Sequence, residues 1–243
     1  MMPSTTQNRG SVRVGRLFGI DIRLHWSFLL LFALIALVSS DRSQFLMNLL
    51  WIAAVFGSVL PHELSHCFVA RRRGAIVKDI LLTPIGGMSE MQRIPQAPSD
   101  EAAIAVVGPL TSVGLGLVIA GIGALTGARL WPPTLFAGSW FARLAWLNLA
   151  LGGFNLLPAL PMDGGRVFRA LLARHHDRSS ATRIAGLVAR VLALAMAVVG
   201  ILYDYWLVII AIYVWLGARS EEYAANSLSG DDRQGRSPGP PDS

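Results

Sequence analysis

Long hydrophobic stretches alternate with short, mostly basic ones along this chain. The hydrophobic stretches cover about 24–38, 45–70, 102–125, 135–157 and 184–216. An α-helix rises 1.5 Å per residue, so about 20 apolar residues cross the ~30 Å hydrocarbon core of a bilayer. The last stretch is too long for one crossing and divides near Asp204. The pattern therefore predicts an all-α polytopic membrane protein with about six transmembrane helices.

Composition supports this fold class. The chain has 243 residues, of which 53% are hydrophobic and 15% charged. A soluble domain carries about 25% charged residues, and here the charges gather between the hydrophobic stretches. We therefore attribute the net charge of +6 to loops on the cytoplasmic side of a lipid bilayer and expect no nucleic-acid partner. The single cysteine, Cys67, excludes an intrachain disulfide.

The positions of the arginines predict the domains and their orientation. Residues 1–23 are basic and are expected to form a cytoplasmic tail. Residues 24–219 hold the six spans, and the polar residues 220–243 are expected to be disordered. The triplet 71–73, all arginine, follows the second stretch, and basic residues at span ends favour the cytoplasm. We expect a multi-pass protein of the cell membrane with both termini in the cytoplasm.

The sequence HELSH at 62–66 lies inside the second hydrophobic stretch. On a helix, His62 and His66 share one face, one turn apart, so both imidazoles can reach one ion. Glu63 lies beside them and could take a proton from a water that a metal has made acidic. This HExxH pattern is typical of zinc hydrolases, and it predicts one Zn²⁺ per chain.

The membrane setting decides between a metal site and a satisfied polar cluster. In a soluble helix, two histidines four residues apart are as often a solvated face as a metal site. Inside a bilayer, polar side chains are costly and by default mark a functional site facing the interior of the bundle. Arg143 is the other charge well inside a predicted span, and the sequence leaves open whether it pairs inside the bundle or reaches outward.

A second polar motif ends the fourth hydrophobic stretch. The sequence NLLPALPMDGGR at 155–166 contains two prolines and two glycines, which stop a helix and leave Asp163 on bent backbone. The second and fourth stretches run in the same direction across the membrane, so the two motifs are expected at the same depth. Asp163 is then available as a third ligand, which leaves the fourth tetrahedral position for water.

Residues 78–95 are too polar to span a membrane and too apolar for a free loop. Their pattern predicts a strand, a turn and a returning strand at the membrane surface. Non-helical backbone at that depth is tolerated where protein buries it or a cavity hydrates it. A hairpin beside the metal site meets that condition.

The HExxH motif together with Asn-x-x-Pro-x-x-Pro-x-Asp-Gly at 155–164 resembles the site-2 protease family of intramembrane zinc metalloproteases. The resemblance covers about residues 16–172 and is nearest to the sporulation-type branch of bacteria and archaea, with neither a CBS nor a PDZ domain expected here. It implies zinc bound by His62, His66 and Asp163, with Glu63 as general base. It also implies that four residues shape the substrate or oxyanion site: Asn155, Pro161, Gly86 and Gly87. Capping of its own helix is an equal alternative for Asn155.

The resemblance implies hydrolysis of a peptide bond in or next to the transmembrane helix of a single-span membrane protein. A zinc transporter or metal sensor could use the same ligands but would need further ligands along a path across the bilayer. Histidine occurs only at 25, 62, 66, 175 and 176, so no such path is visible. A silent scaffold would more naturally lack Glu63 or a ligand. The sequence leaves the substrate and the oligomeric state open, a homo-oligomer included.

Overall fold

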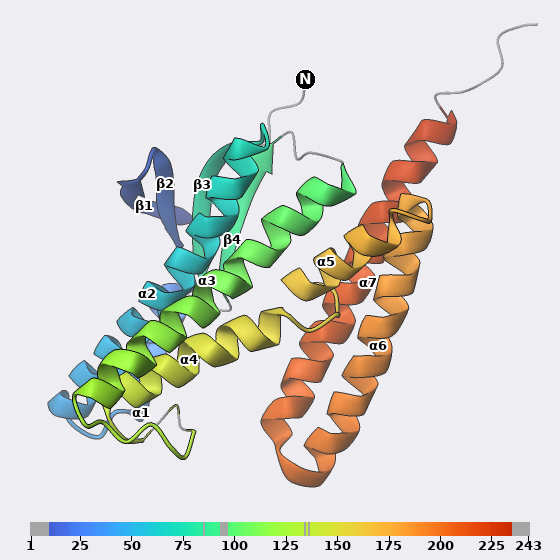
Figure 1. Cartoon of the computed structure of the whole chain (residues 1–243). Helices are drawn as coiled ribbons and strands as arrows, with labels where there is room; N and C mark the ends of the chain where they lie inside the picture. Colours follow the sequence, from blue (N-terminus) through green and yellow to red (C-terminus); the bar gives the residue numbers. More distant parts are fainter. Residues whose placement is uncertain (1–9, 85, 93–96, 134, 136, 235–243) are drawn as a thin grey trace, which may run out of the picture. The chain divides into compact units, whose positions relative to one another are not determined.

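The computed structural model describes most of the chain (Figure 1). The described residues are 10–84, 86–92, 97–133, 135 and 137–234. Their contacts define two compact units, each described by itself below. The first unit is Met1–Gln96 with Val107–Gly153, and the second is Ala97–Val106 with Phe154–Ser243.

The first unit combines a four-stranded sheet with long helices. Its strands are β1 (Ser11–Leu17), β2 (Ile20–His25), β3 (Ile76–Thr83) and β4 (Gly86–Gln92). Its helices are α1 (Phe28–Val38), α2 (Arg42–Arg72), the larger part of α3 (Pro98–Leu125), and α4 (Trp140–Asn155) as far as Gly153.

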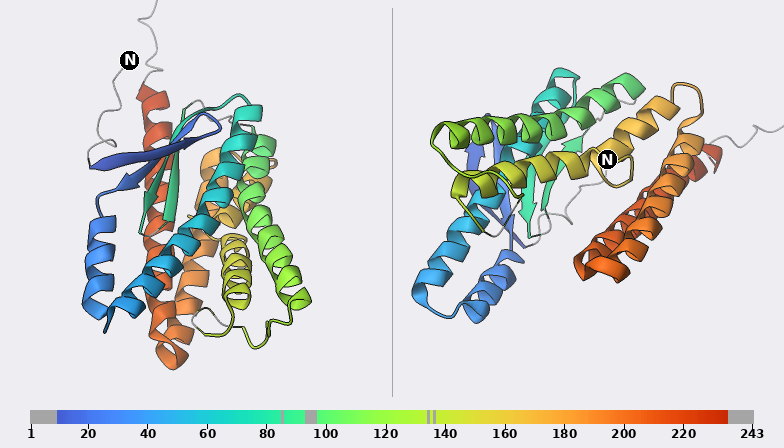
Figure 2. Two further views of the ribbon diagram at one scale, coloured as in Figure 1. Left: turned by 90° about the vertical axis from the view of Figure 1, so that its left-hand side faces the viewer. Right: turned by 60° about the horizontal axis from the view of Figure 1, so that its bottom comes forward.

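The sheet has the strand order β1-β2-β3-β4. β1 pairs with β2 and β3 with β4 in antiparallel fashion, whereas β2 and β3 are parallel. Strands β3 and β4 pack against α2, and the sheet is drawn beside that helix in the left view of Figure 2. The predicted hairpin is therefore present, as β3 and β4. The other two strands occupy a segment for which the sequence predicted no secondary structure, because its hydrophobic alternation is short and interrupted.

Among the described residues, three helices are long and apolar enough to cross a membrane: α2, α3 and α6 (Arg178–Tyr203). α1 is a shorter apolar helix of 11 residues, and α4 has 16. The chain is thus mainly helical with several membrane-length helices, as predicted. The helix that carries the histidines, α2, continues without a break through Pro61.

Small residues bring α3 and α4 together in the first unit. A Cβ at Gly116 would lie 3.0 Å from the carbonyl oxygen of Ala145. A Cβ at Gly152 would lie 2.8 Å from the carbonyl oxygen of Pro109. Only glycine allows two helix backbones to approach so closely.

Arg143 belongs to the same helix bundle and lies between two indole rings. Its guanidinium carbon is 4.1 Å from the ring centroid of Trp51 and 4.9 Å from that of Trp140. Its Nε donates to the carbonyl of Leu135 at 3.2 Å. The arginine thus has cation–π partners on α2 and α4, which accounts for a charge inside a predicted span.

The second unit contains α5 (Asp163–Leu172), α6 and α7 (Tyr205–Gln234). α6 and α7 lie side by side (Figure 1). Ala185, Ala189 and Ala193 form a small-residue stripe on α6, and the proline-containing segment before α5 is buried against it through Leu160 and other residues. The helix break after α4 is therefore held in a fixed conformation by the core of this unit.

An ion cluster around the buried side chains of Arg169 and Glu101 joins four helices of the second unit. Arg169 on α5 donates through Nε to Glu101, at the start of α3, at 2.8 Å, and through a terminal nitrogen to Glu221 on α7 at 2.8 Å. Arg178 on α6 lies 3.4 Å from the second carboxylate oxygen of Glu101. α7 continues as helix to Gln234, well past residue 219, and the pairing of Glu221 gives one reason why the polar sequence there stays helical.

Candidate metal centre

His62 and His66 are buried on α2 and converge on one point. Their Nε2 atoms are 3.2 Å apart. Two nitrogens bound to one tetrahedral zinc at about 2.0–2.1 Å would be about 3.3 Å apart. The histidine pair therefore fits a zinc ion, as the helical spacing predicted.

Ser112 on α3 orients the first of these histidines. His62 Nδ1 and Ser112 Oγ are 3.0 Å apart, and both side chains are buried. For Nε2 to offer its lone pair to a metal, the ring proton must sit on Nδ1 and be donated to the serine oxygen. The serine hydroxyl can accept this proton, so the contact is compatible with the tautomer that metal binding requires.

Gly108, one turn before Ser112 on α3, lies against the histidine nitrogens. A Cβ at this position would lie 2.9 Å from His62 Nε2 and still closer to His66 Nε2. Any larger residue would therefore occupy the space toward which both nitrogens point. The glycine therefore allows α3 to pass directly against the two histidine side chains.

Glu63 lies under strand β4 and is half-buried. Ser89 Oγ donates to its Oε2 at 3.4 Å. A Cβ at Gly87 would lie 3.0 Å from the carboxyl carbon of Glu63. The strand therefore needs glycine where it crosses the carboxylate, and Glu63 stays partly accessible.

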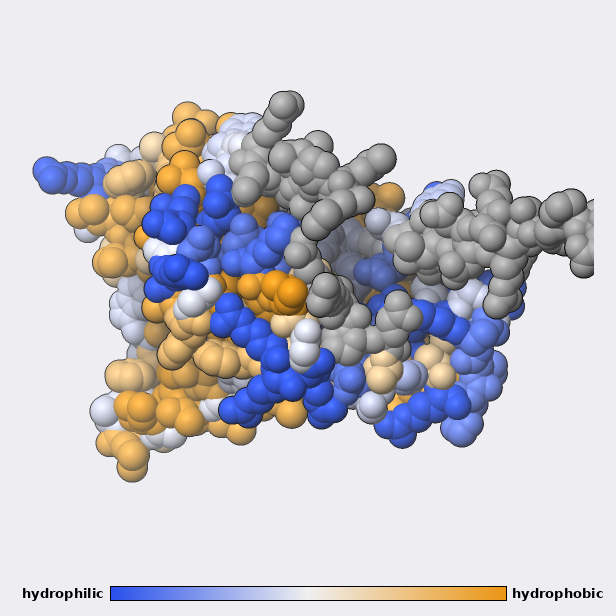
Figure 3. All heavy atoms as spheres, turned by 90° about the horizontal axis from the view of Figure 1, so that it is seen from above, coloured by the Kyte–Doolittle hydropathy of each residue, from blue (hydrophilic) through white to orange (hydrophobic). Residues whose placement is uncertain are grey.

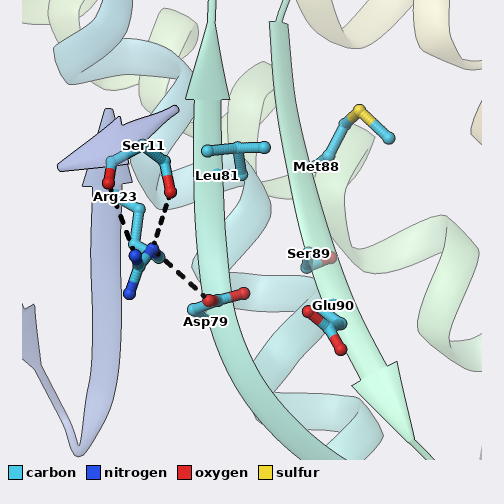
Figure 4. Close-up of a pocket in the computed structure, with 7 residues that line it drawn as sticks. All are labelled: Ser11, Arg23, Asp79, Leu81, Met88, Ser89 and Glu90. Atoms are coloured by element: carbon cyan, nitrogen blue, oxygen red, sulfur yellow. Dashed lines mark hydrogen bonds and ion pairs between the residues drawn. The ribbon is translucent and has the colours of Figure 1, made fainter. Parts of the chain in front are cut away.

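A pocket with both polar and apolar lining residues opens on the sheet (Figure 4). It is lined by Ser11, Arg23, Asp79, Leu81, Met88, Ser89 and Glu90. Arg23 Nε lies 3.8 Å from Asp79 and donates to Ser11 Oγ at 2.9 Å. Burial raises the pKa of Asp79 above its ordinary value, and the neighbouring Glu90 acts in the same direction, while Arg23 opposes it. Ser89 links this pocket to Glu63.

Asp163 is the first residue of α5 in the second unit and is buried. Its Oδ1 lies 3.9 Å from a guanidinium nitrogen of Arg166. The two glycines that follow Asp163 face backbone: a Cβ at Gly164 would collide with the carbonyl of Leu156, and one at Gly165 with the backbone around Ala159. The aspartate thus begins a helix whose first turn folds tightly back on the segment before it.

The other predicted site residues of the second unit flank this helix start. Asn155 is half-buried and is the last residue of α4. Pro161 packs on α7, where a Cβ at Gly217 would lie 2.5 Å from its ring. In the first unit, Gly86 begins β4 with φ of +151°, a conformation that favours glycine.

Sequence reasoning missed Ser112, Gly108 and Ser89. The first two resemble ordinary packing residues, because small residues are common where membrane helices meet. Their spacing of four residues places both on one face of α3, which was the available signal. Nothing in the sequence relates Ser89 to Glu63, since the contact depends on how the sheet lies on α2.

Comparison with known proteins relates the chain to a family of peptidases. The sequence profile of peptidase family M50 matches residues 50–137 and 133–199. A zinc metalloprotease of Methanocaldococcus jannaschii is 37% identical over 212 residues, covering 87% of this chain and 60% of the relative. Rip3 of Mycobacterium tuberculosis is 33% identical over 235 residues, covering 88% and 59%. The chain thus spans about 60% of the length of these curated relatives.

A solved structure is similar in fold as well as in sequence. The site-2 protease from Methanocaldococcus jannaschii superimposes with a TM-score of 0.63 at 34% identity, covering 87% of this chain and 95% of that one. The profile match alone extends over more than half of the 243 residues. The chain belongs to peptidase family M50, and its resemblance to the site-2 proteases is confirmed.

Proposed function

We propose that this protein is an intramembrane zinc metalloprotease that cleaves a peptide bond in or next to the transmembrane helix of a single-span membrane protein. The observation that carries the proposal is the buried pair of Nε2 atoms, 3.2 Å apart, on an apolar helix of membrane length. Glu63 follows the first histidine directly in the chain. The names of the relatives, zinc metalloprotease and site-2 protease, support the same reaction.

We assign the third ligand to Asp163. It is a buried carboxylate next to tightly folded backbone, and it follows the fourth hydrophobic stretch at the predicted depth of the histidines. Zinc takes histidine nitrogen and carboxylate oxygen in catalytic sites and keeps one position for water or substrate. Two histidines and one aspartate make such a set.

Three residues of the chain then have separate roles in hydrolysis. When bound, zinc polarises the scissile carbonyl and makes water more acidic. Glu63 takes the proton of the attacking water and passes it to the leaving amine. Ser112 keeps His62 in the binding tautomer, and the carboxamide of Asn155 is suited to hydrogen-bond the substrate carbonyl.

The outer edge of strand β4 can bind the backbone of the substrate. β4 is the last strand in the order β1-β2-β3-β4, so one side of its backbone has no strand partner among the described residues. A substrate helix must unwind before cleavage, because its carbonyls are bonded within the helix. The unwound segment can add to β4 as a further strand, directly beside Glu63.

This edge is best tested from the substrate side. A Cβ at Gly87 would strike Glu63, and Gly86 has a positive φ, so substitution at either glycine would disturb more than the edge. We expect an extended peptide inhibitor to lose potency when alternate amides that face β4 are N-methylated. Methylating the intervening amides is the matched control. Equal loss in both registers would remove β4 from substrate binding.

The orientation and the number of spans complete the proposal. Six crossings would place both termini in the cytoplasm, with the arginines that follow α2 on the same side. We retain residues 24–219 as the membrane domain and the sporulation-type branch as the nearest group. Cysteine accessibility in sealed vesicles, with cysteines placed at Arg42 and Arg72, tests opposite exposure of the two ends of α2.

Metal analysis tests the ligand set. His62→Ala and His66→Ala should abolish zinc in the purified protein, and Asp163→Ala should lower its affinity, because each removes one of three ligands. Asp177→Ala is a matched control, since Asp177 caps α6 through Ser180 and lies outside the site. Full zinc occupancy in Asp163→Ala would remove Asp163 from the set while leaving the histidine pair in place.

A further inference from the structure

The turn between β1 and β2 has an unusual residue at its tip. Phe18 and Gly19 connect the paired residues Leu17 and Ile20, and both have positive φ, +51° and +77°. Such two-residue turns favour Asn-Gly or Asp-Gly, and a bulky residue with positive φ is an outlier. The side chain of Phe18 is 68% exposed. A strained backbone that displays an exposed aromatic ring points to a role outside the core.

This turn is fixed to the last turns of α2. Arg71 donates from its two terminal nitrogens to the carbonyl oxygens of Phe18, at 2.7 Å, and Gly19, at 3.2 Å. The rings of Phe18 and Phe68 pack edge to face with centroids 5.1 Å apart. These contacts hold the tip at a fixed position along the axis of α2, next to Phe68.

The tip then lies at the boundary between the hydrocarbon core and the headgroups, given that α2 crosses the bilayer. α2 has 31 residues and is about 46 Å long, close to the ~40–45 Å of a bilayer with its headgroups. Its ends, Arg42 and Arg72, then lie in the two headgroup layers. Phe68 lies one turn, about 6 Å, inside Arg72, so Phe18 lies where aromatic side chains favour the interface.

Basic side chains surround the tip. Residues 11–21 and 68–73 contain five arginines and one acidic residue, Asp21. Arg13 and Arg16 share this acid at 3.6 and 3.4 Å, yet their side chains remain 60% and 64% exposed. Arg72 is also exposed. In the view from above, hydrophilic residues lie directly beside hydrophobic ones (Figure 3), the mixture expected at a membrane surface.

We propose that the β1–β2 tip is an anchor for anionic phospholipids of the cytoplasmic leaflet. The ring of Phe18 enters the acyl boundary, and Arg16 and Arg72 bind lipid phosphates on either side of it. A lipid surface fits better than a protein partner because the exposed ring, the end of the span and the excess of positive charge coincide at one depth. The anchor ties the sheet that covers Glu63 to the lipid composition of the membrane.

The retention of bound lipid tests the proposed role of the arginine charges. The full-length protein is reconstituted in nanodiscs of phosphatidylcholine with phosphatidylglycerol, released into detergent, and its bound lipids are counted by native mass spectrometry. The double variant Arg16→Gln/Arg72→Gln should bind phosphatidylglycerol about fivefold more weakly for each arginine removed. Arg42→Gln/Arg129→Gln is the control, because it removes the same charge from exposed positions, one of them the opposite end of α2.

The depth of residue 18 in the membrane tests the proposed position of the Phe18 ring. A nitroxide attached to Phe18→Cys should be relaxed by oxygen, which concentrates in lipid, rather than by a water-soluble nickel chelate. Cys67 is fully buried and does not compete for the label. Phe18→Asn, which suits a positive φ, should keep the fold and zinc content but lose phosphatidylglycerol. Equal lipid retention in the two double variants, or relaxation of the nitroxide mainly by nickel, overturns the proposal.

Discussion

At the scale of single residues, the metal centre depends on two neighbours of the histidines that carry no charge. The HExxH motif can be recognised in a sequence because it combines metal-binding residue types with helical spacing. Ser112 and Gly108 cannot be recognised in this way, because a serine and a glycine in an apolar helix are usually packing residues. Their role follows from the packing of α3 on α2. It places Ser112 Oγ 3.0 Å from His62 Nδ1, and Gly108 where an added Cβ would lie 2.9 Å from His62 Nε2. Pairwise helix geometry of this kind is not encoded in local periodicity.

Ser112→Ala should weaken zinc binding by about 10–100-fold, the usual effect of losing a partner that orients a ligand. Competition with a chelator of known affinity measures it. Thr111→Ala is the control, because Thr111 Oγ1 bonds only the carbonyl of Val107 on its own helix at 2.8 Å. Equal zinc affinity in both variants would mean that the serine does not set the tautomer of His62.

Gly108→Ala should abolish zinc binding while leaving the protein folded. The added methyl group would enter the space between the two Nε2 atoms, yet alanine favours a helix by about 1 kcal/mol over glycine. Gly114→Ala on the same helix meets nothing within 4 Å and is the control. Zinc content and thermal unfolding are measured together, and normal zinc in Gly108→Ala would contradict the site geometry.

At the scale of elements, helices were easier to predict than strands. Hydrophobic stretches 15 to 30 residues long predicted the positions of α1 to α4 to within a few residues at most ends, because bilayer thickness imposes their length. The first two strands were not predicted, since β1 pairs with β2, and β2 in turn pairs with β3, which lies far along the chain. The continuation of α7 past residue 219 depends likewise on a long-range partner, Arg169.

Removing Arg169 should destabilise the second unit. Arg169→Met leaves Glu101, which is 5% exposed, with only the more distant Arg178. Removing one partner of a buried ion pair lowers the free energy of unfolding by about 3 kcal/mol. For a chain of this size, this corresponds to a fall of roughly 6–12 °C in the midpoint of thermal unfolding. Circular dichroism in detergent records it. The double variant Arg169→Met/Glu101→Leu should recover most of the loss, and failure to recover would mean that packing, not charge, explains the effect.

At the scale of the whole molecule, the sequence supports more of the function than of the architecture. Membrane class, the histidine pair and the family were all predictable, because metal chemistry needs particular residue types at particular spacings. The role of Glu63 as general base stays a prediction. The division into two units was not, since it depends on how α3 is shared between them. The assignment of Asp163 to the same ion rests on its burial, its predicted depth and the family.

The measurement that bears most directly on the central claim is cleavage of a single-span membrane substrate by Glu63→Gln. The substitution keeps the shape of the side chain and removes the base, so zinc content should be unchanged while the cleavage rate falls by about 10²–10⁴-fold. The wild-type cut should map to the cytoplasmic half of the substrate span, because His62 lies eight residues, about 12 Å, before Ala70. A transporter or sensor would be indifferent to this change. Cleavage by Glu63→Gln at the wild-type rate would contradict the proposed protease mechanism.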